Sequence, residues 1–82
     1  MQLRILLFAG IRELADADSV TIDVDDNANA ADVLSAIERV LPQAAPLIHV
    51  SRLAIDGQYV AADHPVSPTA DEFALIPPVS GG

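Results

Sequence analysis

Apolar and polar residues alternate with a period of two along short stretches of the chain, and this pattern predicts β-strands. In residues 19–24 every second residue is apolar, so one face of this strand is expected to be buried and the other solvated. Residues 2–8 and 72–76 have apolar side chains at both odd and even positions, so both faces of these strands are apolar. A strand of this kind is central in its sheet or has contacts on both faces.

A helical period occurs over residues 29–41. Asn29 is a good N-cap, and Asp32 lies in the first turn, where the helix dipole favours a carboxylate. The spacing predicts one buried apolar stripe, which consists of Ala30, Val33, Leu34, Ile37 and Leu41. Pro42 is expected to end this helix, and Pro46 is expected to keep the following stretch irregular.

Weaker signals fill the rest of the chain. Residues 11–14 predict one or two helical turns. Residues 52–55 and 58–60 predict a hairpin whose turn is Asp56-Gly57. Residues 61–70 contain two prolines and predict a loop.

The resulting order is strand, short helix, strand, helix and three strands, which predicts an α+β fold in one domain over residues 1–76. A mixed sheet of four or five strands wrapped on one main helix, with a short extra helix, forms the β-grasp arrangement. One main helix covers only one face of such a sheet. The apolar residues then left on the open face are Leu6, Phe8, Ala74 and Ile76. Exposed apolar surface often marks a docking site, unless residues 61–70 or the short helix cover it.

Composition limits the class of protein. The 82 residues allow one small domain, which buries roughly 60–65% of the surface of the unfolded chain. No apolar run approaches the ~20 residues of a membrane span, and the alternating start does not resemble a signal peptide. There is no cysteine, which excludes disulfides, thiolate metal sites and cysteine nucleophiles. We therefore expect a cytoplasmic protein held together by its core.

The chain is acidic, with a formal net charge of −8 from 12 acidic residues, four arginines and no lysine. The arginines are scattered along the sequence at Arg4, Arg12, Arg39 and Arg52. Such a surface repels phosphate backbones, so nucleic acid is not an expected partner. The acidity suits docking on a basic protein surface, or it serves solubility alone.

Side chains suited to autonomous catalysis are sparse. His49 and His64 are the only histidines, and they lack the spacing of a helical metal site. We interpret His49 as a satisfied or surface histidine and His64 as a brace for its turn. Asp25-Asp26 does not match a calcium loop, and there is no glycine-rich phosphate loop. The sequence therefore predicts no bound metal or cofactor and no independent active site.

Residues 77–82 carry the most distinctive pattern. Pro77-Pro78 restricts the backbone to an extended course, and the four residues from Val79 onward reach at most ~13–14 Å. Gly81 and Gly82 place no side chain beside the terminal carboxylate. A narrow slot in a partner could admit such an extended tail; the alternative is a frayed terminus.

These features resemble a known family, the sulfur-carrying small subunits of molybdopterin synthase, which are ubiquitin-like β-grasp proteins. The resemblance runs from end to end. It rests on Leu7-Phe8-Ala9-Gly10-Ile11-Arg12-Glu13-Leu14, Asp63-His64-Pro65, Asp71-Glu72-Phe73-Ala74-Leu75-Ile76 and Pro77-Pro78-Val79-Ser80-Gly81-Gly82. Two turns depart from the family pattern. Pro68-Thr69-Ala70 replaces the usual aspartate-glycine turn, and Asp56-Gly57 stands where asparagine is usual.

The resemblance implies a mechanism. An adenylating enzyme similar to ubiquitin-activating enzymes would use ATP and magnesium to convert the Gly82 carboxylate to an acyl-adenylate. A sulfurtransferase would supply the sulfur that displaces AMP and leaves a Gly82 thiocarboxylate. The tail would enter the large subunit and deliver sulfur to cyclic pyranopterin monophosphate, forming the dithiolene of molybdopterin. The family implies a heterotetramer with two small subunits on a large-subunit dimer.

The resemblance also implies which residues contact the large subunit. They are Phe8, Val60 and Ile76, followed by the tail residues Pro77, Pro78, Val79 and Ser80 that lead to Gly81 and Gly82. Arg12 would pair with the partner or serve the structure alone. The missing lysines fit a carrier whose activated end must not react with its own amines. Rival interpretations are a sulfur carrier for thiamine, thiolated tRNA or cysteine, an interaction module with an inert tail, and a modifier joined to lysines.

Overall fold

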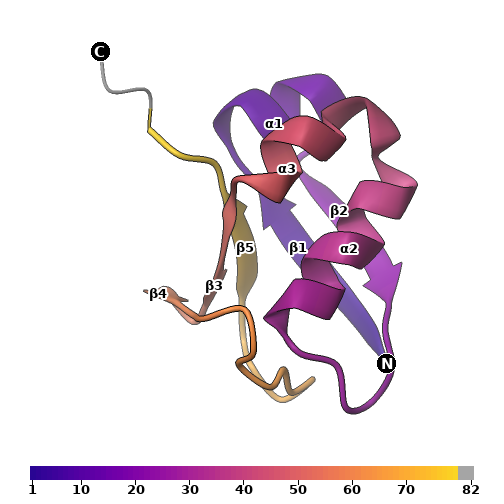
Figure 1. Ribbon diagram of the computed structural model, residues 1–82, viewed down its shortest axis with the longest axis vertical. Coiled ribbons are helices and arrows are strands. Elements are labelled where there is room, and N and C mark those ends of the chain that lie inside the picture. Colours follow the sequence, from indigo (N-terminus) through magenta and orange to yellow (C-terminus); the bar gives the residue numbers. More distant parts are fainter. Residues whose placement is uncertain (80–82) are drawn as a thin grey trace.

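The computed structural model describes residues 1–79, which form a single sheet with helices on one side (Figure 1). The elements are β1 (Gln2–Leu7), α1 (Ala9–Ala15), β2 (Ser19–Asp23), α2 (Ala30–Val40), the 3₁₀ helix η1 (Pro42–Ala44), α3 (Ala45–His49), β3 (Arg52–Ile55), β4 (Gln58–Tyr59) and β5 (Phe73–Ile76). This architecture confirms the predicted α+β class and every predicted strand, with ends that differ by one residue at most.

The sheet is mixed and has the strand order β2-β1-β5-β3-β4. β1 and β5 are parallel, and all other neighbouring strands are antiparallel. β5 is the middle strand, with β1 beside it. The two strands whose faces are both apolar therefore occupy interior positions of the sheet. The inner face of the sheet packs under the helices, and the largest fully buried side chains are Ile5, Ile11, Val33, Ile37, Ile48, Leu53 and Leu75.

The main helix α2 begins as its sequence predicts. The Asn29 side-chain oxygen accepts a hydrogen bond from the Asp32 N–H at 2.9 Å, and the Asp32 carboxylate accepts one from the Asn29 N–H at 3.0 Å. This reciprocal capping box satisfies two backbone donors at the start of the helix. Val33 and Ile37 are fully buried, which confirms the apolar stripe, and Ala36 joins them.

The prediction of an irregular stretch after Pro42 is wrong, because residues 42–49 form η1 and α3. Proline disrupts the interior of a helix, but at the first turn its missing N–H has no intrahelical partner to lose. Pro42 and Pro46 each stand at the first or second position of their helix. The two prolines therefore begin helices rather than prevent them, and Ile48 of α3 becomes part of the core.

Helix α1 begins two residues earlier than predicted, at Ala9. Its Ile11 is fully buried, and Gly10 faces α3. A Cβ on Gly10 would lie 3.0 Å from Leu47 Cδ2, a separation that would force Leu47 to move. The small residue thus allows α1 to pack closely on α3.

The outer face of the sheet is open, because residues 61–70 and helix α1 both pack elsewhere. Residues 61–70 pack on the start of α2 instead, where the Ala30 N–H donates to the His64 carbonyl at 3.0 Å and the Ala31 N–H to the Ala62 carbonyl at 2.9 Å. Helix α1 packs against η1 and α3, on the inner side. No helix within residues 1–79 is long and apolar enough to cross a membrane.

The apolar residues expected on the open face differ in exposure. Phe8 is 42% exposed, and Leu6 and Ile76 are half-buried. Ala74 is a correction, because it lies on this face but is only 6% exposed. Its short side chain lies between Leu6 of β1 and Ala54 of β3, and these neighbours shield it.

Asp56 joins the β3–β4 hairpin to the start of β5. Asp56 and Gly57 both have positive φ, at 50° and 84°, as a two-residue type I′ turn requires. The Asp56 carboxylate accepts hydrogen bonds from the N–H groups of Asp71 at 2.9 Å and Glu72 at 2.8 Å. One side chain therefore links the Asp56-Gly57 turn to the two residues that follow Pro68-Thr69-Ala70.

Replacing Asp56 with alanine is expected to lower the free energy of unfolding by about 1–2 kcal/mol, because two charge-assisted hydrogen bonds are lost at an exposed site. Asp56→Asn keeps an acceptor oxygen, and asparagine tolerates positive φ. It should therefore lower the free energy of unfolding by less than half as much as Asp56→Ala. Urea denaturation followed by circular dichroism measures both values. A free energy of unfolding for Asp56→Ala equal to that of the unaltered protein would show that these hydrogen bonds contribute nothing.

Candidate functional site

The tail leaves the sheet at its middle strand. Ile76 is the last residue of β5, and Pro77 and Pro78 follow it without regular secondary structure. The chain then runs away from the body of the protein (Figure 1), and Val79 is 92% exposed. The remaining predicted site residues, Ser80, Gly81 and Gly82, lie outside the described residues.

A shallow apolar hollow of about 590 Å³ lies at the root of the tail. Five of the predicted contact residues line it together, namely Phe8, Ile76, Pro77, Pro78 and Val79. Phe8 stands between β1 and α1 with an extended backbone, φ −133° and ψ 156°, and remains exposed as the chain turns into the helix. Residues from the two ends of the chain thus form one surface beside the tail.

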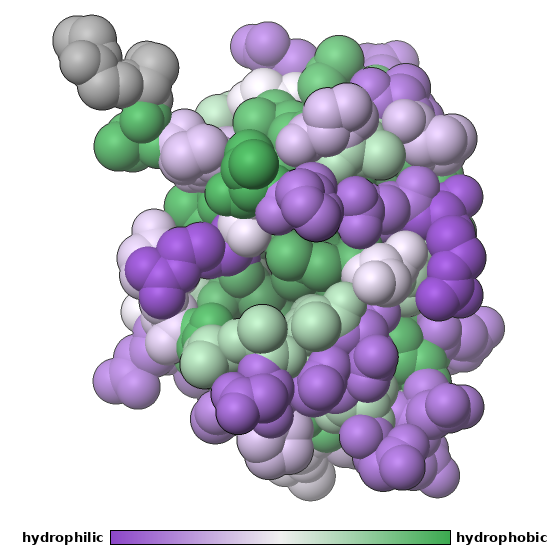
Figure 2. Space-filling model, viewed as in Figure 1, coloured by the Kyte–Doolittle hydropathy of each residue, from purple (hydrophilic) through white to green (hydrophobic). Residues whose placement is uncertain are grey.

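Val60 is not part of this surface. It is half-buried against the core and lines a separate hollow of about 520 Å³ between α2 and β3, together with Leu34 and Leu53. Figure 2 shows this hollow as a recessed apolar area on the helix-bearing side of the molecule. The structure therefore does not bring Val60 together with Phe8 and Ile76.

Tyr59, the residue before Val60, lies on the open face. The turn at residues 56–57 pairs Tyr59 with Ala54, which in turn pairs with Ala74, and residues directly opposite one another share a face. The Tyr59 side chain is 54% exposed. Its position follows from the two-residue turn, so counting outward from Asp56-Gly57 would have identified it in the sequence.

Arg12 lies on α1 one turn after Phe8, whose carbonyl accepts a hydrogen bond from the Arg12 N–H at 3.3 Å, and its side chain pairs within its own chain. Its Nε is 3.2 Å from an Asp18 carboxylate oxygen, and both side chains are largely exposed. An exposed pair of this kind contributes at most about 1 kcal/mol. Arg12 could therefore exchange Asp18 for a partner's carboxylate at little cost.

The described residues form surfaces suited to binding a partner. Within residues 1–79, no three histidine, aspartate or glutamate side chains lie together as a metal site requires. His49 and His64 are exposed, and it is the backbone of His64 that braces its turn, donating to the Ala61 carbonyl at 3.0 Å. The arrangement can present a tail beside an apolar docking surface.

Comparison with known proteins gives consistent matches over the whole chain. The model of the ThiS family matches residues 5–82. The molybdopterin synthase sulfur carrier subunit of Dictyostelium discoideum is 36% identical over 83 residues, covering 99% of this chain and 96% of that protein. The subunit of the same name from Chlamydomonas reinhardtii is 34% identical over 83 residues, with both chains fully covered.

Among solved structures, SAMP1 from Haloferax volcanii superposes with a TM-score of 0.84 at 28% identity, with both chains fully covered. This protein is a small archaeal modifier protein, and the match confirms the ubiquitin-like β-grasp fold. With the family model spanning nearly all residues and the fold in agreement, the chain belongs to the ThiS family of sulfur carriers.

Proposed function

We propose that this protein is the sulfur carrier subunit of molybdopterin synthase. The observation that carries the proposal is the match, from end to end, to two relatives that bear this name. The geometry agrees with it, because a tail that leaves the middle of the sheet beside an uncovered apolar surface can enter a partner that docks on that surface.

The chemistry takes place at Gly82. A Gly82 carboxylate oxygen attacks the α-phosphorus of ATP, and pyrophosphate leaves as the acyl-adenylate forms. The terminal sulfur of a persulfide on the sulfurtransferase then attacks the acyl carbon, and AMP leaves. A second thiol reduces the acyl disulfide so formed, which gives a disulfide with the donor's thiol and leaves the Gly82 thiocarboxylate. In the large subunit this sulfur attacks a carbon of cyclic pyranopterin monophosphate and displaces an oxygen substituent. Water then cleaves the acyl–sulfur bond, which leaves the sulfur on the pterin and restores the Gly82 carboxylate; the two sulfurs of the dithiolene require two such transfers.

Three partners supply what the carrier lacks. An adenylating enzyme similar to ubiquitin-activating enzymes binds ATP and magnesium, and a sulfurtransferase provides the sulfur. The molybdopterin synthase large subunit provides the acid–base groups and the phosphate-binding site. Two carriers on a large-subunit dimer form the heterotetramer, which acts in the cytoplasm.

A second candidate is a protein modifier, favoured by the likeness to SAMP1 in fold and sequence. Activation of Gly82 is common to both functions, but the acceptor differs: a modifier forms isopeptide bonds with lysine side chains of other proteins. Extracts of the host would then contain conjugates of higher mass, whereas a dedicated carrier gives none.

Mass spectrometry tests the proposal directly. The protein is incubated with ATP, magnesium, the host's activating enzyme and a sulfur donor, and the terminal fragment is sequenced by fragmentation. The exchange of one oxygen for sulfur should appear on Gly82. Oxidation of Met1 adds nearly the same mass, so the fragment that carries the increment must be located. A terminus that stays unmodified under these conditions would contradict the proposal.

The docking surface gives a further prediction, which separates Tyr59 from Val60. Tyr59→Ala should weaken binding to the large subunit about 30-fold, which is typical of an aromatic residue at the centre of an interface. Val60→Ala removes a half-buried side chain from the opposite side, so it should lower the thermal midpoint with less than about a threefold effect on affinity. Calorimetric titration of the folded variants measures both. A larger loss of affinity for Val60→Ala would place the interface on the helix side.

A further inference from the structure

The open face carries two cations, Arg4 and Arg52, and Arg52 is the one opposite Ile76, the last residue before the tail. Register places these strand residues on the half of that face nearest the tail: Leu6, Arg52, Ala54, Tyr59, Ala74 and Ile76. Arg52 is the single charged residue among these six, although the chain has a net charge of −8. The acidic character of the protein is therefore interrupted at the surface that surrounds the tail.

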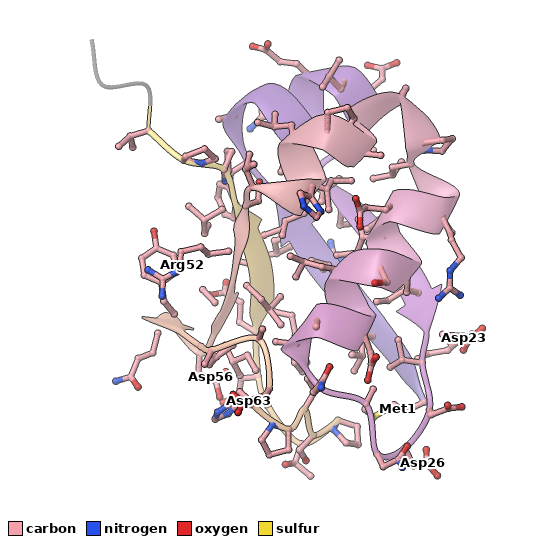
Figure 3. The ribbon with its side chains drawn as sticks, in the orientation of Figure 1. Met1, Asp23, Asp26, Arg52, Asp56 and Asp63 are labelled. Atoms are coloured by element: carbon pink, nitrogen blue, oxygen red, sulfur yellow. The ribbon has the colours of Figure 1, made fainter. Side chains whose placement is uncertain are left out.

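Two contacts fix where Arg52 lies. It is the register partner of Ile76, the last residue before Pro77, and its guanidinium carbon is 4.4 Å from the centroid of the Tyr59 ring. Figure 3 shows the Arg52 side chain on the side of the sheet away from the helices. The aromatic ring supports the guanidinium through a cation–π contact, so the charge is held at the root of the tail.

The donors of this guanidinium are left for a partner. Within residues 1–79 Arg52 forms no ion pair, whereas Arg12 is paired with Asp18 and Arg4 donates to the Ser19 hydroxyl at 3.2 Å. Stacking on an aromatic face occupies the plane of the guanidinium and leaves its edge open. That edge presents two parallel N–H groups that match the two oxygens of a carboxylate.

We propose that Arg52, held by Tyr59, binds an aspartate or glutamate on the partner surface that receives the tail; this inference rests on the proposed function. Charge selects this occupant, because a partner suited to an acidic carrier is basic elsewhere, and Arg52 is the charged residue opposite the last residue before the tail. Seated opposite Ile76, the ion pair fixes the partner's position relative to Pro77. It thereby sets how far the tail extends into the partner.

Binding measurements with the purified large subunit test this assignment. Arg52→Glu is compared with Arg39→Glu, which makes the same change in net charge on the helix side. Arg52→Glu should weaken affinity by at least about 30-fold, because two carboxylates then face one another. Arg39→Glu should change affinity less than about threefold. Arg52→Lys keeps the charge but loses the two-pronged geometry, and a loss of about fivefold to tenfold is expected.

Circular dichroism melts establish that each variant is folded. If Arg52→Glu does not fold, Arg52→Gln takes its place, and its affinity for the large subunit is expected to fall about tenfold. Reversing the partner's carboxylate to lysine should restore the affinity of Arg52→Glu. If Arg52→Glu binds as Arg39→Glu does, while the unaltered chain binds and delivers sulfur from Gly82, the assignment of Arg52 is overturned and the proposed function stands. If the unaltered chain does not bind the large subunit at all, both are overturned.

Discussion

Removal of Gly82 is expected to reduce sulfur transfer by about 100-fold or more while leaving the domain folded. The shortened chain still ends in a glycine carboxylate, Gly81, so the terminus keeps its chemical type. Its reach falls by one residue, ~3.3–3.6 Å, and a misplacement of even 1 Å in a reacting group costs on the order of 10²-fold in rate. Dithiolene formation by the large subunit, started with excess activated carrier, measures the effect.

Two comparisons make this result specific. Gly82→Ala keeps the length of the tail and adds only a methyl group beside the carboxylate, so it should transfer faster than the shortened chain. Asp63 is exposed in the loop of residues 61–70, which packs on the start of α2. Asp63→Asn should therefore transfer sulfur at the rate of the unaltered chain. Transfer at a normal rate by the shortened chain would contradict the proposed function, provided that its thermal midpoint is unchanged.

Leu75→Ala is expected to lower the free energy of unfolding by about 2–5 kcal/mol, the range for a leucine removed from a buried site. Leu75 is fully buried and belongs to the middle strand, opposite Leu7 on one side and Leu53 on the other. At roughly 0.05–0.15 kcal/mol per residue, a domain of this length has about 4–12 kcal/mol in total. This one substitution therefore removes a large share of the stability.

Leu14→Ala is the matched control, because the same atoms are removed from a leucine that is 48% exposed on α1. Its loss should stay within about 0.5 kcal/mol, as for other surface substitutions. Denaturant titrations of both variants give the comparison. Similar losses at the two positions would mean that the middle strand does not anchor the core.

The sequence predicted most of the fold because most of its signals are local. The two-residue alternation of the strands, the capping residues Asn29 and Asp32, and the turn at residues 56–57 each act over a few neighbouring positions. Pro46 misled the prediction, because proline both stops and starts helices, and which it does depends on its position within the turn.

The predictions for the site needed information that local patterns do not contain. The residue types of the tail were evident, but its origin in the middle of the sheet depends on the strand order. The face occupied by Tyr59 depends on register, and the hydrogen bonds of Asp56 to residues 71 and 72 join segments 15 and 16 residues apart. The stack of Arg52 on Tyr59 requires two strands to pair before the contact exists.

The central place of β5 also has a consequence for how the chain folds during synthesis. Ile5 and Phe73 are register partners although they lie 68 positions apart in the sequence (73 − 5), and β5 joins the β2–β1 pair to the β3–β4 pair. Neither pair is linked to the other until residues 73–76 have left the ribosome. Pairing over so long a separation is slow to form, so the nascent chain exposes its apolar strands for most of the seconds that its synthesis takes.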